Sequence, residues 1–248
     1  MDAEIALPGG NVGGAVRVGD TVRRATGPWT PAVHGLLNYL ADAGLTGIPR
    51  VHGFDDQGRE ILDYLPGTSY GPEVPDDVLA DAMRWLADYH RVVASYRPEG
   101  EIVWRTSRSE LAVDQIICMH DYGYYNWIGT ADGFSGVIDW DMAGPGVRLD
   151  DIAFTAWNTV PLAVPMDPAY QAARLRLMAA SYGGDVFTPR QILEGAPIRA
   201  QRSARVIRAG QVAGDPGMLN LGTVGEPERT ERRLKDLQRR VPEIAAHL

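Results

Sequence analysis

Hydrophobic and polar positions near the start of the chain alternate with the period of two that is typical of β-strands. Residues 13–24 alternate small or apolar side chains with polar ones around a turn at residues 18–21, which predicts a β-hairpin. Residues 51–54 and 60–65 predict two further strands, joined by a polar turn at residues 55–58. The first part of the chain is therefore predicted to contain a small sheet.

One helix is predicted between these two pairs of strands. Apolar residues recur at helical spacing from Val33 to Leu40, after Thr30 as the expected N-cap and Pro31 at the first helical position. Gly44 marks the expected end of this helix.

After the break at residues 66–67 the pattern becomes mainly helical. Helices are predicted at residues 78–96, 169–182, 198–212 and 226–247, and short strands at residues 116–118 and 136–138. The change of pattern predicts an α+β architecture with two lobes. A small β-rich lobe with one helix would span residues 1–67, and a larger, mainly helical lobe would span residues 68–248.

Composition narrows the class of protein. With 45% hydrophobic and 23% charged residues among 248, the chain has an ordinary globular composition. Its only cysteine, Cys118, excludes an internal disulfide, no apolar run approaches a membrane span, and residues 1–20 lack a signal-peptide pattern. A cytoplasmic protein without a membrane partner is expected. The net charge of −8 argues against nucleic acid as the main partner.

The basic residues are almost all arginine. Lys235 is the only lysine among 24 basic side chains. Since arginine stays protonated and cannot act as an amine nucleophile, Schiff-base chemistry and a lysine general base in the body of the fold are excluded.

The most informative spacing is that of Asp121, Asn126 and Asp139. Asn126 follows Asp121 by five residues, and Asp139 comes 13 residues later at the end of an apolar strand. One carboxylate that orients a hydroxyl, together with an amide oxygen and a second carboxylate that hold a divalent ion, is a pattern suited to phosphoryl transfer.

The segments at residues 118–128 and 136–141 resemble the catalytic loop and metal-binding strand of the aminoglycoside phosphotransferase and choline kinase group. The resemblance continues through residues 143–153 and includes residues 7–67. It implies the bilobal protein-kinase-like fold, and a nucleotide as co-substrate.

The resemblance also implies roles for particular carboxylates and amides. Asp121 would be the catalytic base, Asn126 and Asp139 the Mg²⁺ ligands, and Asp141 a further carboxylate of the metal site. Asp151 would be a buried brace for the catalytic segment.

The expected nucleotide contacts lie in the first lobe. Residues 62–65 would form the hinge against the base of ATP or GTP, and the contacts are placed on Asp63 and Leu65. A glycine-rich turn would cover the phosphates with backbone N–H groups. Its residues are Gly9, Gly10, Asn11, Val12, Gly13 and Gly14.

Three positions depart from the family pattern. Met119 stands where a histidine is usual, and His120 lies beside it. The phosphate-pairing lysine of the third strand is missing, with Arg23 and Arg24 as the nearest cations. The helix that usually supplies a glutamate partner for that cation offers His34 and no acid.

Other polar and aromatic features have two interpretations. Cys118 is expected to be a buried hydrophobe rather than a nucleophile, and His90 a packing or capping residue. The aromatic residues at positions 122, 124, 125 and 127 fit either a substrate wall or the core. Arginines at positions 199, 202, 205 and 208 fit either a solvated helix face or the border of a pocket for an anionic or neutral acceptor.

The sequence therefore predicts a small-molecule kinase that transfers the γ-phosphoryl group of ATP or GTP to a hydroxyl acceptor. The alternative is a catalytically silent kinase-like protein that binds a nucleotide or a metabolite. The missing lysine and helix glutamate favour the alternative, whereas the complete set of Asp121, Asn126 and Asp139 favours the enzyme. The acceptor cannot be inferred from the sequence.

Overall fold

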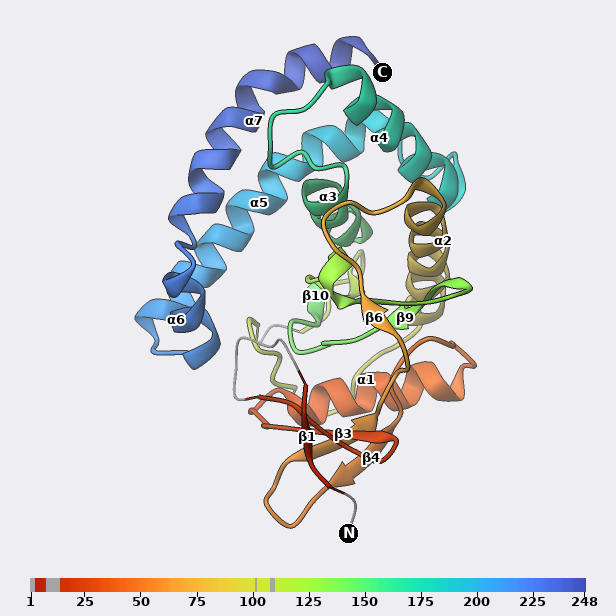
Figure 1. The fold of residues 1–248 in the computed structure, drawn as a ribbon, viewed down its shortest axis with the longest axis vertical. Helices are drawn as coiled ribbons and strands as arrows, with labels where there is room; N and C mark the ends of the chain where they lie inside the picture. Colours follow the sequence, from red (N-terminus) through yellow and green to blue (C-terminus); the bar gives the residue numbers. More distant parts are fainter. Residues whose placement is uncertain (1–2, 8–13, 101, 108–109) are drawn as a thin grey trace.

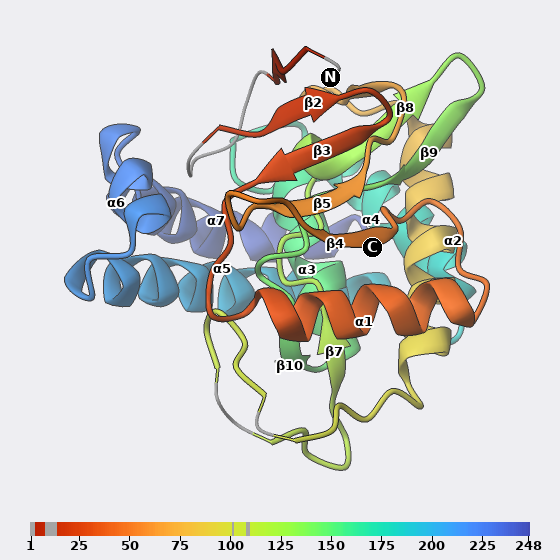
Figure 2. The ribbon, with the colours of Figure 1, turned by 90° about the horizontal axis from the view of Figure 1, so that it is seen from below.

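Five short antiparallel strands form a sheet at one end of the molecule, in the order β1-β2-β3-β5-β4 (Figures 1 and 2). The computed structural model describes residues 3–7, 14–100, 102–107 and 110–248. The strands are β1 (Ile5–Ala6), β2 (Val16–Val18), β3 (Thr21–Arg24), β4 (Val51–Phe54) and β5 (Glu60–Asp63). The predicted hairpin is confirmed as β2 and β3, and the two later strands are confirmed as β4 and β5.

The sheet is accompanied by helix α1 (Thr30–Asp42) (Figure 2). The predicted helix is present, but its N-cap is Trp29 rather than Thr30. The Thr30 hydroxyl instead accepts a hydrogen bond from the Gly27 backbone N–H at 2.9 Å, which closes the turn before the helix. Leu36 and Leu40 on the apolar face are fully buried, so packing anchors the helix.

The other end of the molecule consists mainly of helices (Figure 1). They are α2 (Asp76–Val93), α3 (Arg148–Thr159), α4 (Pro168–Gly183), α5 (Pro189–Val212), α6 (Pro216–Thr223) and α7 (Glu228–Ala246). The four helices expected from the sequence are present, whereas α3 and α6 were not expected. Helix α5 begins earlier than predicted because Thr188 forms a capping box with Gln191.

Two small antiparallel sheets lie between the helices and the five-stranded sheet. Strand β7 (Ile116–Cys118), which has the predicted bounds, pairs with β10 (Gly144–Gly146). Strands β6 (Thr68–Ser69), β8 (Trp127–Thr130) and β9 (Gly133–Val137) form the other sheet. The predicted strand at residues 136–138 corresponds to the end of β9. The lobe boundary after residue 67 stays a prediction.

The hydrophobic core fixes the segment that carries the predicted chemistry. Tyr122, Trp127 and Trp140 of this segment are fully or almost fully buried, and the buried Tyr89 of α2 packs against Trp140. The Tyr122 hydroxyl donates a 2.7 Å hydrogen bond to the Ala82 carbonyl of α2. Two members of the predicted aromatic group, Tyr122 and Trp127, therefore belong to the core. No helix in the described part of the chain is long and apolar enough to cross a membrane.

Candidate active site

The catalytic loop predicted around Asp121 follows β7 and is held by a buried carboxylate. Asp151, in the first turn of α3, is completely buried. Its carboxylate accepts backbone N–H hydrogen bonds from Met119 at 2.9 Å and from His120 at 2.7 Å. His120 has a φ of 60°, a conformation that ordinary residues rarely adopt and that costs about 1–3 kcal/mol. The two bonds to Asp151 hold this strained backbone directly before Asp121.

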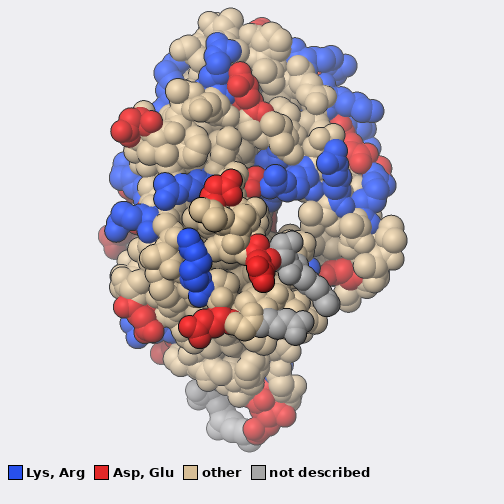
Figure 3. Space-filling model, turned by 180° about the vertical axis from the view of Figure 1, so that it is seen from behind, with Lys and Arg blue, Asp and Glu red and all other residues tan. Residues whose placement is uncertain are grey.

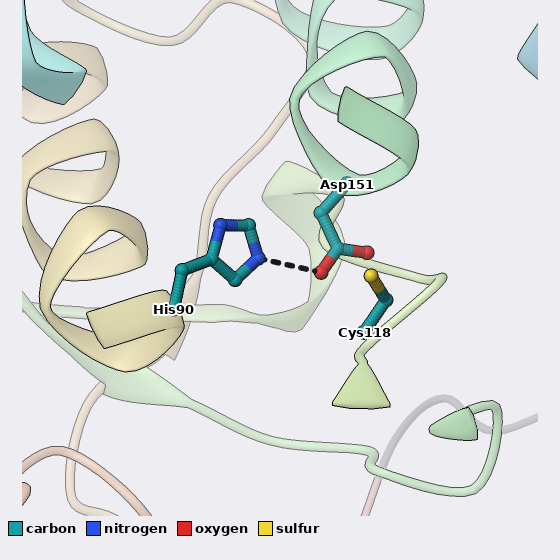
Figure 4. Close-up of side chains that lie close together, drawn as sticks. All are labelled: His90, Cys118 and Asp151. Atoms are coloured by element: carbon teal, nitrogen blue, oxygen red, sulfur yellow. Dashed lines mark hydrogen bonds and ion pairs between the residues drawn. The ribbon is translucent and has the colours of Figure 1, made fainter. Parts of the chain in front are cut away.

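His90 completes the brace. Its Nε2 lies 3.0 Å from an Asp151 oxygen, which joins α2 to α3 (Figure 4). Its Nδ1 lies 2.8 Å from the Tyr182 hydroxyl, which joins α2 to α4. Burial raises the pKa of Asp151, but the hydrogen bond and charge of His90, with the backbone donors, outweigh it and lower the pKa below its usual value. His90 thus supports the catalytic loop, a role beyond the packing or capping expected for it.

Cys118 lies beside this pair, and the three side chains are close enough to suggest a metal site (Figure 4). Their bonds argue otherwise. The Cys118 thiol donates to the Val147 carbonyl at 3.3 Å, and burial raises its pKa well above the usual value, so it stays a neutral thiol. The prediction that Cys118 is buried is confirmed.

Asp121 is half-buried and receives two side-chain hydrogen bonds. The Tyr125 hydroxyl donates to Oδ1 at 2.5 Å, and the Asn126 amide donates to Oδ2 at 3.0 Å. Burial and the neighbouring charge of Asp139 raise the pKa of Asp121 to about 7, against the effect of these donors. The carboxylate is therefore poised to accept a proton near neutral pH.

One backbone hydrogen bond joins the segments that carry the predicted metal ligands Asn126 and Asp139. The Ile138 backbone N–H donates to the Asn126 carbonyl at 2.9 Å, which ties the end of β9 to the catalytic loop. Asp139 follows with a φ of 59° and a half-exposed side chain. Because Asn126 uses its amide N–H₂ on Asp121, its side-chain oxygen is left for another partner. The carboxylates of Asp139 and Asp141 and the amide oxygen of Asn126 are ligand types that suit a hard divalent ion.

Arg24 contacts both aspartates of the predicted metal site, Asp139 and Asp141. Its Nη1 lies 3.2 Å from Asp139 Oδ1, and its Nη2 contacts Asp141 Oδ1. A guanidinium already seated on these carboxylates shows that the cluster favours positive charge. The charges of Asp141 and Asp139 raise the pKa of Arg24, against the effect of burial. Arg23, on the other face of β3, instead donates to the Thr21 hydroxyl.

Glu60 is a site residue that was not predicted. It is buried, and directly opposite Arg24 across the β3–β5 pair, where Arg24 Nε contacts its Oε1. His34 from α1 lies 2.8 Å from its other oxygen. The acid that α1 lacks is thus supplied by β5, and His34 holds it. No sequence signal marked Glu60, because its position opposite Arg24 depends on the pairing of β3 with β5.

Arg105 is a second cation near the predicted metal ligands, and it was also not predicted. One guanidinium nitrogen lies 3.6 Å from Asp141 Oδ2, and another lies 2.8 Å from Asp215, the N-cap of α6. The guanidinium lies 4.5 Å over the ring of Trp29. Arg105 therefore links Asp141 to the N-terminus of α6 and to the start of α1.

The expected nucleotide contacts have different outcomes. Gly9, Gly10, Asn11, Val12 and Gly13 lie outside the described residues, and Gly14 has a φ of 42° just before β2. Asp63 ends β5 and donates its backbone N–H to Arg50 at 3.0 Å, so that group is already paired. Leu65 lies beyond the strand, and within the described chain its backbone makes no hydrogen bond.

The predicted arginine stripe on α5 does not form one surface. Arg199 is buried and donates a 2.5 Å hydrogen bond to the His120 carbonyl. Arg202 pairs with Asp150 at 2.7 Å, and Arg208 pairs with acids of α7. Arg205 is exposed. Lys and Arg side chains form a band across the rear face of the molecule (Figure 3).

Comparison with known proteins agrees with this geometry. Residues 102–185, which include the catalytic loop and Asp139, match the model of the phosphotransferase enzyme family. An amicoumacin kinase structure superposes with a TM-score of 0.65 over 97% of this chain and 88% of that chain, at 11% identity. Residues 102–185 are therefore similar to a phosphotransferase-family domain, and the chain has the protein-kinase-like fold of this neighbour.

Two further kinase structures support the same fold. Choline kinase from Cryptosporidium parvum has a TM-score of 0.62 at 8% identity, covering 98% of this chain and 90% of that chain. Aminoglycoside 2′-phosphotransferase-IIIa has a TM-score of 0.59 at 14% identity, covering 95% and 93%. The predicted α+β kinase-like fold is confirmed.

A sequence relative is the trifolitoxin immunity protein of Rhizobium leguminosarum bv. trifolii. It is 33% identical over 168 residues, or 65% of this chain. The matched segment spans 64% of that relative, just under two thirds of its length.

Proposed function

We propose that this protein is a nucleotide-dependent small-molecule phosphotransferase that transfers the γ-phosphoryl group of ATP or GTP to a hydroxyl. The observation that carries the proposal is that Asp121 and Asn126 lie on one braced loop, and that the residue before Asp139 is hydrogen-bonded to this loop. The family match over this same segment supports it. A silent binding protein is not favoured, because such a protein has no need of a held carboxylate base beside two metal ligands.

In the proposed reaction Asp121 orients the acceptor hydroxyl and takes its proton. Its raised pKa, near 7, suits a base that works at neutral pH. Tyr125 and Asn126 fix the two carboxylate oxygens, so the acceptor meets a carboxylate in one orientation.

Asn126 and Asp139 would hold a divalent ion, for which Mg²⁺ is our proposal, with Asp141 as a further carboxylate beside it. Such an ion, when bound, neutralises the charge of the nucleotide phosphates. Arg24 occupies the position in β3 from which a cation reaches these acids, and it would steady the phosphates bidentately. The unpaired backbone of Leu65 would contact the base.

The acceptor is proposed to be a hydroxyl-bearing toxin or antibiotic encountered in the cytoplasm. The 33% identical relative is an immunity protein, and one structural neighbour is a kinase of amicoumacin. Phosphorylation of such a compound would provide immunity by changing its charge and shape.

A transfer screen tests the proposal. Purified protein, Mg²⁺ and γ-labelled ATP or GTP would be incubated with aminoglycosides, macrolides, amicoumacin, choline, and sugar or amino alcohols. Label in a product, lost with Asp121→Ala, would support the proposal. Absence of metal-dependent binding of either nucleotide would contradict it.

A further inference from the structure

Arg24, which is proposed to bind the nucleotide phosphates, is already paired with three carboxylates of the protein. Its three guanidinium nitrogens each contact a different carboxylate: Nε contacts Glu60, Nη1 contacts Asp139 at 3.2 Å, and Nη2 contacts Asp141. The Arg24 side chain is only 19% exposed, and its pairs with Glu60 and Asp141 are shielded from water, whereas Asp139 is 44% exposed. Shielded ion pairs are weakened little by salt and cost free energy to break.

The contacts use atoms that a divalent ion would need. Arg24 takes Oδ1 of both Asp139 and Asp141. A cation that binds these carboxylates from the same side must compete with the guanidinium, because two positive charges at this distance repel one another.

The third contact gives Arg24 a place to remain when the other two are broken. Glu60 lies directly across the sheet from Arg24, and the contact of His34 with its second oxygen fixes its orientation. Asp141 likewise keeps a cation, since Arg105 lies 3.6 Å from its other oxygen. The guanidinium can therefore leave the two aspartates without leaving Glu60 unpaired.

We propose that Arg24 acts as an internal counter-ion of Asp139 and Asp141, which excludes the metal ion until a nucleotide supplies phosphates that Arg24 can bind instead. This inference rests on the proposed function only in taking these aspartates as metal ligands. Metal and nucleotide then bind with positive coupling, and each tightens the other by the same factor. Arginine at this position makes the enzyme a poor binder of free metal.

The test is metal binding without turnover. Mn²⁺ affinity would be measured by electron paramagnetic resonance, with and without a non-hydrolysable ATP or GTP analogue, for the wild type and Arg24→Gln. The wild type is expected to bind Mn²⁺ weakly alone and on the order of tenfold more tightly with the analogue. Arg24→Gln is expected to bind Mn²⁺ alone about tenfold more tightly than the wild type and to lose most of the coupling.

Arg23→Gln is the matched control, because Arg23 is the neighbouring arginine on the other face of β3. Its Mn²⁺ affinity should equal that of the wild type. Arg24→Lys keeps a positive charge opposite Glu60 but has one nitrogen instead of three, so it should fold and show an intermediate gain. It decides the question if Arg24→Gln does not fold.

Mn²⁺ affinity that is unchanged or weaker in both Arg24 variants would overturn the inference. Coupling in Arg24→Gln that is as large as in the wild type would overturn it as well. If the wild type binds no nucleotide with Mn²⁺ present, the proposed function fails, whereas the measurement with Mn²⁺ alone still decides whether Arg24 competes with the ion.

Discussion

At the scale of single residues, the chemistry follows from groups close together in the sequence. Asp121, Asn126 and Asp139 were predicted because the catalytic loop and the following strand preserve a local spacing. Glu60 was not predicted, because its contact with Arg24 depends on β5 lying beside β3 although β4 comes between them in the sequence. Local spacing is visible in one sequence, whereas pairing between distant strands is not.

Replacement of the proposed base tests its role directly. Asp121→Ala should lower kcat by about 10²–10⁴-fold while nucleotide affinity changes little, since the carboxylate acts on the acceptor proton. Isothermal titration and a turnover assay would measure the two effects. Undiminished turnover would show that Asp121 is not the base.

The brace predicts a dependence of stability on pH. Because the folded-state pKa of Asp151 lies below its ordinary value of about 4, its contribution to stability is fully present above about pH 4 and is lost as the pH falls through the folded-state pKa. Asp151→Asn should lower the free energy of unfolding by about 1–3 kcal/mol at pH 7.

Urea titrations of the wild type and Asp151→Asn at pH 7 and pH 3 would measure this dependence. The difference between the two proteins should be smaller at pH 3. A difference that is equal or larger at pH 3 would mean that the ionised carboxylate is not what holds the loop.

At the scale of elements, segments with a regular apolar period were predicted, and segments whose Pro and Gly positions resemble a loop were not. Helices α4 and α7 have sustained apolar spacing, and their predicted bounds differ from the observed ones by one or two residues. Strand β10 has the sequence Gly-Pro-Gly, which has no strand propensity and pairs only because β7 lies beside it. Helix α6 has only eight residues, and its Pro and Gly positions resemble a loop.

Helix α5 should act on the catalytic loop through one side chain. Arg199 holds the His120 carbonyl, and its guanidinium lies 4.8 Å over the Phe154 ring of α3. Arg199→Met should lower the free energy of unfolding by about 1–3 kcal/mol and lower kcat, with nucleotide affinity largely retained.

The exposed Arg205 on the same helix provides the matched control. Arg205→Gln should leave both stability and kcat close to the wild-type values. Equal effects of the two substitutions, measured by urea titration and turnover, would contradict a specific role for Arg199.

At the scale of the whole molecule, the kinase-like arrangement puts a five-stranded sheet against a helical body (Figure 1). Asp139 and Asp141 contact Arg24 of this sheet. Arg24 comes from the sheet, and Asp121, Asn126 and Asp139 come from the body. The sequence shows that no lysine can pair with Asp139 and Asp141 in the body of the fold. Only the tertiary structure shows that Arg24 pairs with them instead. The fold was predictable from motifs, whereas the contacts of Arg24 with Glu60, Asp139 and Asp141 were not.

The most direct measurement is metal-dependent hydrolysis of γ-labelled ATP and GTP without an acceptor, since water replaces the unknown hydroxyl. The wild type should release labelled phosphate slowly in Mg²⁺ and none in a chelator. Asp121→Ala should abolish this release, and Asp139→Ala should abolish metal-dependent nucleotide binding as well. Release that persists in both variants, or no nucleotide binding by the wild type, would contradict a phosphotransferase built on these residues.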